Sequence, residues 1–255
     1  MSVLISGDFH ANAVNELHSI TAKTLRKQFG GEYSGITHHI IAGDCGFLWP
    51  GCARQDRFHL SVLNCRSAHR PWPVLCLFGN HENYDAITAC EKVDIGIGRE
   101  VYKVLENVYY LPRGFIYTID GLSMLCLGGA LSIDKAYRTE HKSWWKDEYW
   151  SEAEEEDCFR RVSGQHVDYV VSHTGPQGII GDMFGKSIAA EKYIDLVAKF
   201  QDRLRKSLVF DHWFFGHFHE DVLRHKDHGR LYSALYRKTA VVSKHQIIYS
   251  DGSVS

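Results

Sequence analysis

The chain has 255 residues, with 29 Lys and Arg against 31 Asp and Glu, which gives a formal net charge of −2. This length suits a large α/β unit with a substantial core, so we expect a single domain over residues 1–255. The charge lacks the basic excess of general nucleic-acid binders; nucleic acid therefore has no support as a partner, although it stays open. No apolar run approaches the roughly 18 residues of a membrane span, and no leader-like segment follows Met1, which predicts a cytoplasmic protein without a membrane partner.

Cysteine and histidine usage narrows the chemistry. The seven cysteines are odd in number and include no Cys-x-x-Cys pair, which is typical of reduced thiols in a cytosolic protein. Of the 16 histidines, most are assigned to surface and helix-face positions, His39 and His212 among them. The remaining five each follow an apolar run: His10, His81, His173, His217 and His219.

The first half of the chain alternates apolar runs with helical patterns. Short apolar runs at residues 3–6, 40–42 and 74–78 predict buried strands, because each one ends at a polar loop. The segments between these runs carry apolar residues at helical spacing, the first after Asn12 as a candidate cap, and residues 84–89 predict a short helix. This alternation predicts a sheet that is at least partly parallel.

The second half predicts antiparallel strands and further helices. Residues 115–119 and 122–127 read as strands joined by Asp120-Gly121, a strong signal for a two-residue hairpin turn. Ser151 and Glu154 form a capping box at the start of an acidic helix, and residues 187–206 predict another helix. We therefore expect an α/β fold in which two sheets pack together with helices outside.

Polar side chains follow five of the predicted strands, at the point where each strand ends. Ligands of open α/β sheets bind beyond the carboxyl ends of the strands, so these side chains are expected to form one site drawn from the whole chain. The candidate metal ligands are Asp8, His10, Asp44, Asn80, His173, His217 and His219.

Seven ligands exceed the four that a tetrahedral zinc site takes, whereas two ions sharing a bridging carboxylate would use them all. Mixed oxygen and imidazole ligands favour manganese as the ion, with Fe, Zn, Ni or Mg as alternatives. Two ions about 4 Å apart hold a hydroxide at neutral pH and bind phosphoryl oxygens during in-line displacement. Because only Asp8 and Asp44 are carboxylates, the pocket stays positive, which predicts an anionic phosphoester of a small molecule or nucleotide as substrate.

His81 adjoins Asn80 but exceeds the ligand count, so we assign it to proton transfer. A protonated imidazole over the leaving oxygen acts as general acid, a role worth roughly 10²–10⁴-fold in rate. Glu82 is expected to hold His81 or Asn80 in place through a hydrogen bond.

Further candidates for contact with the substrate lie in residues 134–157 and at Trp49. Lys135 and Arg138 follow a predicted strand and are candidates to bind phosphate, Arg138 through its two-pronged geometry; ordinary solvated charges are an equally simple interpretation. The tryptophans Trp49, Trp144 and Trp145 either form an aromatic wall against a ring of the substrate or pack in the core.

Five motifs occur in order along the chain: Asp8-x-His10, Gly43-Asp44, Gly79-Asn80-His81-Glu82, His173 and Gly216-His217-x-His219. In this order and form the sequence resembles the calcineurin-like metallophosphoesterase superfamily. The resemblance implies a four-layer αββα fold with a central β-sandwich. It also implies that Asp44 bridges two ions and that His81 is the proton donor. The implied ligands are Asp8, His10, Asp44 and His219 for one ion and Asp44, Asn80, His173 and His217 for the other.

One departure bears on the activity. Protein phosphatases of this superfamily usually carry Gly-Asp-x-x-Asp, and Phe47 stands at the second Asp position. Those phosphatases also typically lack the Gly-His-x-His motif, so this chain resembles the phosphodiesterase-like branch and the small bacterial or phage branches. We expect a metal-dependent phosphodiesterase or phosphatase. The alternatives are a protein or small-molecule phosphomonoesterase, a nuclease, and a non-catalytic metal-binding scaffold.

Overall fold

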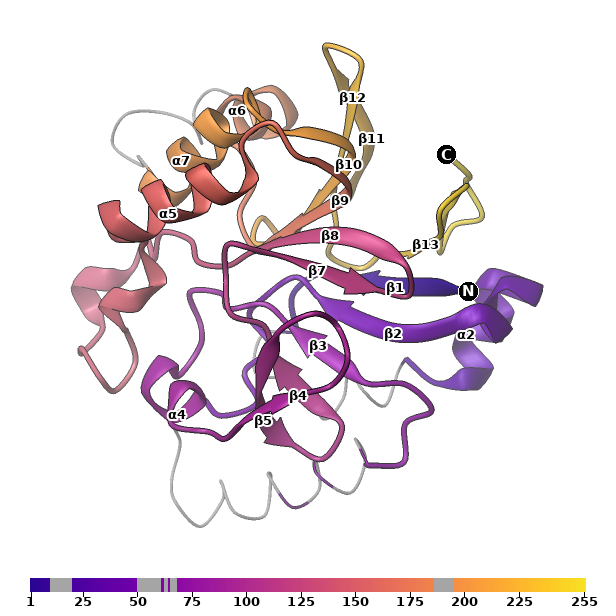
Figure 1. Cartoon of the computed structure of the whole chain (residues 1–255), viewed down its shortest axis with the longest axis horizontal. Helices are drawn as coiled ribbons and strands as arrows, with labels where there is room; N and C mark the ends of the chain where they lie inside the picture. The colour runs from indigo at the N-terminus through magenta and orange to yellow at the C-terminus, as the bar shows by residue number, and fades with distance from the viewer. Residues whose placement is uncertain (10–19, 50–60, 62–63, 65–67, 186–194) are drawn as a thin grey trace.

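A computed structural model describes residues 1–9, 20–49, 61, 64, 68–185 and 195–255 (Figure 1). One set of strands comprises β1 Ser2–Ser6, β2 Ile36–Ile41, β3 Val74–Cys76, β4 Lys92–Asp94, β5 Glu100–Leu105, β6 Val108–Tyr110, β13 Thr239–Val242 and β14 Ile247–Tyr249. The other comprises β7 Phe115–Ile119, β8 Leu122–Leu127, β9 His166–Ser172, β10 Val209–Phe215, β11 Val222–Asp227 and β12 Arg230–Ala234.

The two sets form two sheets. The eight-stranded sheet has the order β14-β13-β1-β2-β3-β6-β5-β4, and the six-stranded sheet has the order β11-β12-β10-β9-β8-β7. Strands β1, β2 and β3 are parallel to one another, as are β8, β9, β10 and β12. The expectation of a partly parallel sheet is therefore confirmed, with antiparallel strands at the edges.

The sheets pack face to face over one apolar core. Val3, Ile40 and Leu75 from the larger sheet meet Met124 and Phe214 from the smaller. The strands β1 and β3 are buried along their whole length because each is covered on both faces. Near-continuous apolar runs, such as residues 3–5, are what such strands require.

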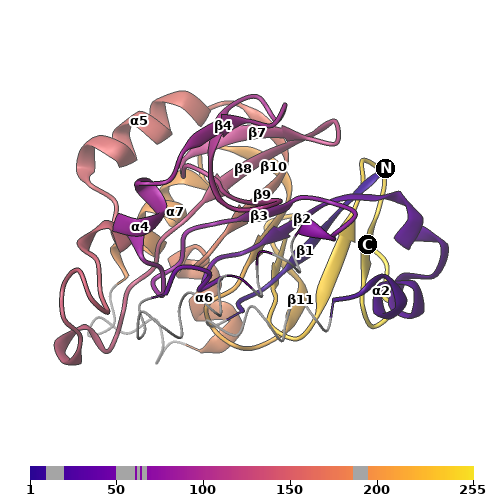
Figure 2. The same ribbon diagram turned by 90° about the horizontal axis from the view of Figure 1, so that it is seen from below.

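Helices cover the outer faces of the sandwich. They are α2 Ala22–Phe29, α4 Tyr84–Thr88, α5 Glu152–Val162, α6 Gln177–Phe184 and α7 Leu196–Leu204, with 3₁₀ turns η1 Gly30–Gly35, η2 Lys135–Tyr137 and η3 Lys146–Glu148. Helices α5, α6 and α7 pack on the six-stranded sheet, and α2 and α4 pack on the eight-stranded sheet. Figure 2 shows α2 at the opposite end of the molecule from α4 and α5. The predicted α/β sandwich with helices outside is confirmed. Among the described residues, no helix combines the length and apolar character needed to span a membrane.

Two local predictions are confirmed in detail. Asp120 and Gly121 both have positive φ, 55° and 76°, as a type I′ turn between β7 and β8 requires. The capping box is complete: the Ser151 side chain accepts from Glu154 N–H, and the Glu154 carboxylate accepts from Ser151 N–H.

Helix boundaries were predicted less well. Helix α7 runs from Leu196 to Leu204 and is capped by Asp195, which accepts the Val197 N–H at 2.9 Å, while residues 187–194 of the expected helix lie outside the described residues. Helix α2 begins at Ala22 under a Thr21 cap, and the expected cap Asn12 lies outside the described residues, as does most of the expected helix around 58–63.

The surface placement of His39 and His212 was wrong, since both are fully buried within strands. His39 on β2 contacts Ser6 Oγ through Nε2. His212 Nε2 lies 2.9 Å from Ser233 Oγ, which lies 2.8 Å from the Tyr249 hydroxyl. Ser233 is on the six-stranded sheet and Tyr249 on the eight-stranded sheet, so these contacts link the two sheets.

The buried His212 predicts acid sensitivity. Burial lowers the pKa of His212 from 6.5 to about 3, so the folded state binds fewer protons than the unfolded state and loses stability as the pH falls below 6.5. One such group contributes a slope of up to about 1.4 kcal/mol per pH unit. His212→Gln keeps a polar partner for Ser233 but does not titrate. We therefore expect a shallower loss of unfolding free energy in urea titrations between pH 6.5 and about 4.

The exposed His166 supplies the matched control, since His166→Gln removes a histidine from the surface of the same sheet. Because His166→Gln leaves the buried His212 in place, this variant should still lose unfolding free energy as the pH falls. If His212→Gln also had the wild-type slope, the buried imidazole would not be a source of the acid sensitivity.

Candidate metal centre

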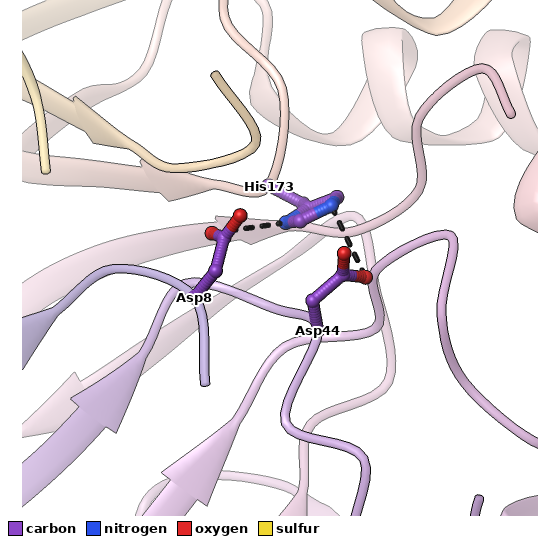
Figure 3. Close-up of side chains that lie close together, drawn as sticks. All are labelled: Asp8, Asp44 and His173. Carbon is purple, nitrogen blue, oxygen red and sulfur yellow. Dashed lines mark ion pairs between the residues drawn. The ribbon is translucent and has the colours of Figure 1, made fainter. Parts of the chain in front are cut away.

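Asp8, Asp44 and His173 lie at the ends of β1, β2 and β9, where the two sheets share an edge (Figure 3). All three side chains are buried, and their candidate ligand atoms lie within 4.8 Å of one another. His173 Nδ1 is 3.8 Å from Asp8 Oδ1, and His173 Nε2 is 3.3 Å from Asp44 Oδ1. Because the carboxyl ends of parallel strands meet at one edge, residues 8, 44 and 173 come together despite their separation in sequence.

The hydrogen bonds of His173 show that this cluster suits a cation. The Ala42 carbonyl lies 2.8 Å from His173 Nδ1, so in the neutral imidazole Nδ1 carries the hydrogen and Nε2 carries a lone pair. That Nε2 faces Asn80 Oδ1 at 3.0 Å and Asp44 Oδ1 at 3.3 Å. Three buried acceptors facing one another are unfavourable, and a divalent ion among them would satisfy all three. The residues therefore fit the metal that the sequence predicts.

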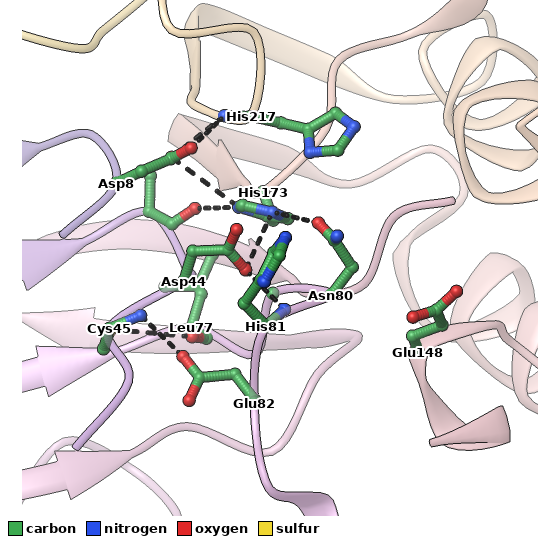
Figure 4. A network of polar contacts seen from close by, with 12 residues as sticks. Asp8, Asp44, Cys45, Leu77, Asn80, His81, Glu82, Glu148, His173 and His217 are labelled. Carbon is green, nitrogen blue, oxygen red and sulfur yellow. Dashed lines mark hydrogen bonds and ion pairs between the residues drawn. The ribbon is translucent and has the colours of Figure 1, made fainter. Parts of the chain in front are cut away.

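The backbone holds both carboxylates from the opposite side. Asp44 Oδ1 accepts the His81 N–H at 2.8 Å, and both oxygens of Asp8 accept the His217 N–H at 2.9 Å (Figure 4). Asp44 and His217 have positive φ values, 49° and 70°, and such conformations typically cost about 1–2 kcal/mol each in non-glycine residues. The surrounding contacts therefore maintain a strained backbone at the site.

Close approach explains two of the motif glycines. A Cβ atom on Gly79 would lie 2.1 Å from Asp44 Oδ1, and one on Gly216 would lie 2.0 Å from Asp8 Oδ1. Neither contact is possible for a real side chain. Glycine is thus required before Asn80 and His217 because each carboxylate packs directly on the backbone of the neighbouring loop.

The two remaining described ligand candidates follow β10. The His217 ring lies 5.0 Å from the His173 ring, and burial together with His173 lowers the pKa of His217 to about 3, which keeps the imidazole neutral and able to ligate. His219 Nε2 lies 3.5 Å from Asp8 Oδ2, and its half-exposed ring stacks on Tyr236. Six of the seven predicted ligands thus gather in one place, and His10 lies outside the described residues.

His81 lies beside the cluster in contact with two side chains that do not belong to it. Its Nε2 is 2.9 Å from Arg138 Nη2, and its ring is 5.5 Å from the Trp49 ring. Arg138 is in turn held by Asp134, whose Oδ1 accepts from Nε at 2.8 Å. A guanidinium has only donors, so His81 Nε2 is the acceptor in this pair.

The other candidates from residues 134–157 have different surroundings. Lys135 Nζ lies 4.0 Å from the centre of the Trp144 ring, a cation–π contact that holds the exposed lysine against the protein. Trp144 and Trp145 are buried, as core packing predicts, while Trp49 is half-buried beside His81.

Glu82 has partners other than those expected. Its two oxygens accept from the Cys45 N–H at 2.6 Å and the Tyr110 hydroxyl at 2.8 Å, so Glu82 braces the residue after Asp44 and not His81 or Asn80 (Figure 4). Burial and the nearby Asp44 raise the pKa of Glu82, and both hydrogen bonds oppose that change.

Sequence reasoning missed two polar residues next to Asn80. Asn80 Nδ2 donates to Ser132 Oγ at 3.2 Å, and Glu148 accepts from the Ser132 N–H at 3.0 Å and from its hydroxyl at 2.7 Å. Burial raises the pKa of Glu148, and the Ser132 hydrogen bonds oppose this by stabilising the carboxylate. The sequence signal that could have indicated them is the position of Glu148 between the aromatic residues Trp145 and Tyr149. A glutamate that is buried among aromatic residues needs hydrogen-bond partners.

Comparisons with solved structures are weak. A mutant cold-active protein tyrosine phosphatase matches 100% of this chain and 79% of its own length, at 14% identity and a TM-score of 0.39. The cold-active protein-tyrosine phosphatase of a psychrophilic Shewanella gives the same coverage and identity with a TM-score of 0.37. Scores this low carry no argument about this chain.

The comparisons of sequence give one clear result. No curated protein shows significant similarity to the chain. Residues 1–221, however, match the Metallophos family, described as calcineurin-like phosphoesterase, over all five motifs. With the mixed α/β sandwich and the buried Asp, Asp and His cluster already described, the chain belongs to the calcineurin-like phosphoesterase family.

Proposed function

We propose that this protein is a dinuclear metal-dependent phosphoesterase in which Asp44 bridges the ions and His81 protonates the leaving oxygen. The observation that carries the proposal is the meeting of three acceptors, His173 Nε2 with Asn80 Oδ1 at 3.0 Å and with Asp44 Oδ1 at 3.3 Å. Membership of a metal-dependent phosphoesterase family supports the same chemistry.

The ligands divide between two sides of Asp44. We assign one ion to Asp8, His10, Asp44 and His219, and the other to Asp44, Asn80, His173 and His217. The contact of His219 with Asp8 and that of Asn80 with His173 support this division. When bound, the two ions, proposed as Mn with Fe, Zn, Ni or Mg as alternatives, supply Lewis-acid stabilisation and activate water.

Arg138 and His81 act in sequence in this proposal. The anionic oxygens of a phosphoester form charge-assisted hydrogen bonds that compete with His81 for the guanidinium. Once Arg138 binds a phosphoryl oxygen, His81 Nε2 is released from its donor, takes up a proton from solvent and can deliver it to the leaving oxygen. Lys135 is a second candidate to bind phosphate. Its ammonium group would have to leave its cation–π contact with Trp144 in order to reach a phosphoryl oxygen.

The residues around His81 favour a small substrate over a phosphoprotein. Phe47, at the position of the second Asp of protein phosphatases, is buried in the apolar cluster of Phe78 and Tyr84 and supplies no carboxylate to His81. The half-buried Trp49 ring beside His81 supports a substrate with a planar group, such as a nucleotide. We therefore propose phosphodiesterase activity on a nucleotide or other small phosphoester, with a phosphomonoesterase as the second candidate.

Metal removal tests the reaction class. Chelation should abolish hydrolysis of bis(p-nitrophenyl) phosphate and of p-nitrophenyl phosphate, and added Mn²⁺ should restore it with two ions bound per chain, because the activity is assigned to the ions. Preference for the diester would support the phosphodiesterase. Two bound ions without turnover of either ester would favour the non-catalytic scaffold, and a single ion would contradict the bridging role of Asp44.

Replacement of His81 tests the general acid. His81→Asn should lower kcat by roughly 10²–10⁴-fold for an ester with an alcohol leaving group, because that group needs a proton. The loss should be much smaller with p-nitrophenolate, which leaves unprotonated. Metal content, measured in parallel, should match the wild type. Equal losses for the two leaving groups would show that His81 does not donate the proton.

Replacement of Arg138 tests phosphate binding. Arg138→Ala removes a charged hydrogen-bond donor worth about 1.5–3 kcal/mol, so kcat/KM should fall roughly 10–100-fold. Lys135→Ala provides the comparison and should cost less, because its ammonium group packs on Trp144. Unchanged kinetics in Arg138→Ala on the best substrate would remove Arg138 from the site.

A further inference from the structure

We infer that Ser132 and Glu148 form a hydrogen-bond relay that orients the Asn80 amide, so that its oxygen faces the cation site. The inference rests on the proposed metal centre and adds two positioning residues to it. The relay runs from Glu148 through Ser132 to Asn80, and all three side chains are buried.

The need for orientation follows from the amide itself. An asparagine side chain has one acceptor oxygen and one donor nitrogen of nearly equal size, and only the oxygen can ligate a divalent ion. Before an ion binds, His173 Nε2 presents a lone pair 3.0 Å from the Asn80 amide. A lone pair attracts the NH₂ group, so His173 alone would favour the amide orientation that cannot bind metal.

The relay begins at the Glu148 carboxylate, which accepts hydrogen bonds from both the backbone N–H and the hydroxyl of Ser132. Glu148 Oε1 lies 3.0 Å from the Ser132 backbone nitrogen, and Glu148 Oε2 lies 2.7 Å from Ser132 Oγ. The hydrogen bonds donated by the Ser132 hydroxyl and N–H favour the ionised form of Glu148 against the effect of burial. An ionised carboxylate only accepts, so the serine hydroxyl points its hydrogen at Glu148. A Cβ on Gly129 would lie 2.2 Å from the Glu148 carbonyl oxygen, so the turn that carries Glu148 packs closely on the loop that carries Ser132.

The relay ends at the amide nitrogen. With its hydrogen committed to Glu148, Ser132 Oγ presents only lone pairs to Asn80 and accepts from Nδ2 at 3.2 Å. The amide oxygen is thereby turned toward His173 and Asp44, where the acceptors gather. Ser132 and Glu148 thus offset the opposite preference of His173 and prepare the site for a cation.

Glu148→Gln reverses the relay with almost no change of shape. The Ser132 N–H requires an acceptor, so the glutamine oxygen would take that position and its NH₂ group would face Ser132 Oγ. The serine hydroxyl would then donate toward residue 80 and favour the flipped amide. We expect Mn²⁺ affinity at one of the two sites to fall about 10–100-fold, measured by calorimetric titration of the full chain. Thermal unfolding of the metal-free protein should change little.

Two further variants test whether a loss of Mn²⁺ affinity comes from the relay or from a general disturbance of the structure. Asp147→Asn removes a neighbouring exposed carboxylate and should bind Mn²⁺ as the wild type does. If Glu148→Gln does not fold, Ser132→Ala interrupts the same relay and should also weaken Mn²⁺ binding. Wild-type Mn²⁺ affinity in either relay variant would overturn the inference.

The Asn80→Asp background gives a test of sign. A carboxylate at position 80 can only accept hydrogen bonds. In the native relay Ser132 Oγ presents lone pairs, which repel this carboxylate. In the Glu148→Gln variant the Ser132 hydroxyl points its hydrogen at position 80 and donates to the carboxylate. Glu148→Gln should therefore weaken Mn²⁺ binding with asparagine at position 80 and strengthen it in the Asn80→Asp background. The same direction in both backgrounds would overturn the relay. Wild-type protein that bound Mn²⁺ without hydrolysing esters would contradict the proposed function alone, and failure to bind Mn²⁺ or any of the alternative ions would contradict both proposals.

Discussion

The structure of the site depends on one electrostatic constraint, the convergence of buried acceptors that repel one another until a cation lies between them. His173 Nε2, Asn80 Oδ1 and Asp44 Oδ1 form its centre, with separations of 3.0 and 3.3 Å from the imidazole nitrogen. The strands before Asp44 and Asn80 belong to one sheet and the strand before His173 to the other. The apolar packing between the sheets therefore holds the acceptors together and maintains the site against their repulsion.

The loops at this edge are braced against one another. The Phe9 N–H donates to the Asp44 carbonyl at 3.2 Å, and the Gly216 N–H donates to the His173 carbonyl at 2.9 Å. The first bond joins the loops after β1 and β2 of the eight-stranded sheet, and the second joins the loops after β9 and β10 of the six-stranded sheet. Asp44 and His217, which both have positive φ, lie in these loops. Local strain and glycine-only contacts reduce stability at the site, and they are kept because they aim the side chains at one point.

The segment between β8 and α5 forms the wall of the site next to Asn80 and His81. It supplies Arg138 to His81, and Ser132 and Glu148 to Asn80. In this chain a guanidinium contacts His81, and the protein-phosphatase position that would carry a carboxylate is the buried Phe47. The residues proposed to bind substrate and to orient the Asn80 amide thus lie largely in this one segment.

The sequence by itself determined the features that depend on local patterns. Apolar runs ended by polar loops predicted the strands and the site at their ends, Asp120-Gly121 predicted the hairpin, and Ser151 with Glu154 predicted the helix cap, because a few neighbouring residues decide each of these. The family motifs predicted a ligand set of seven residues, and the six of them that the structure describes gather at this edge.

Only the tertiary structure decided which side chains meet across the sandwich. Asn80 reaches Ser132 over 52 positions and His173 over 93, separations that no local pattern encodes. The burial of His39 and His212 was likewise decided by the packing of the two sheets, since a histidine in a strand has the same local sequence whether its face is covered or exposed. Contact partners depend on how distant strands are brought together, and that is a property of the folded chain.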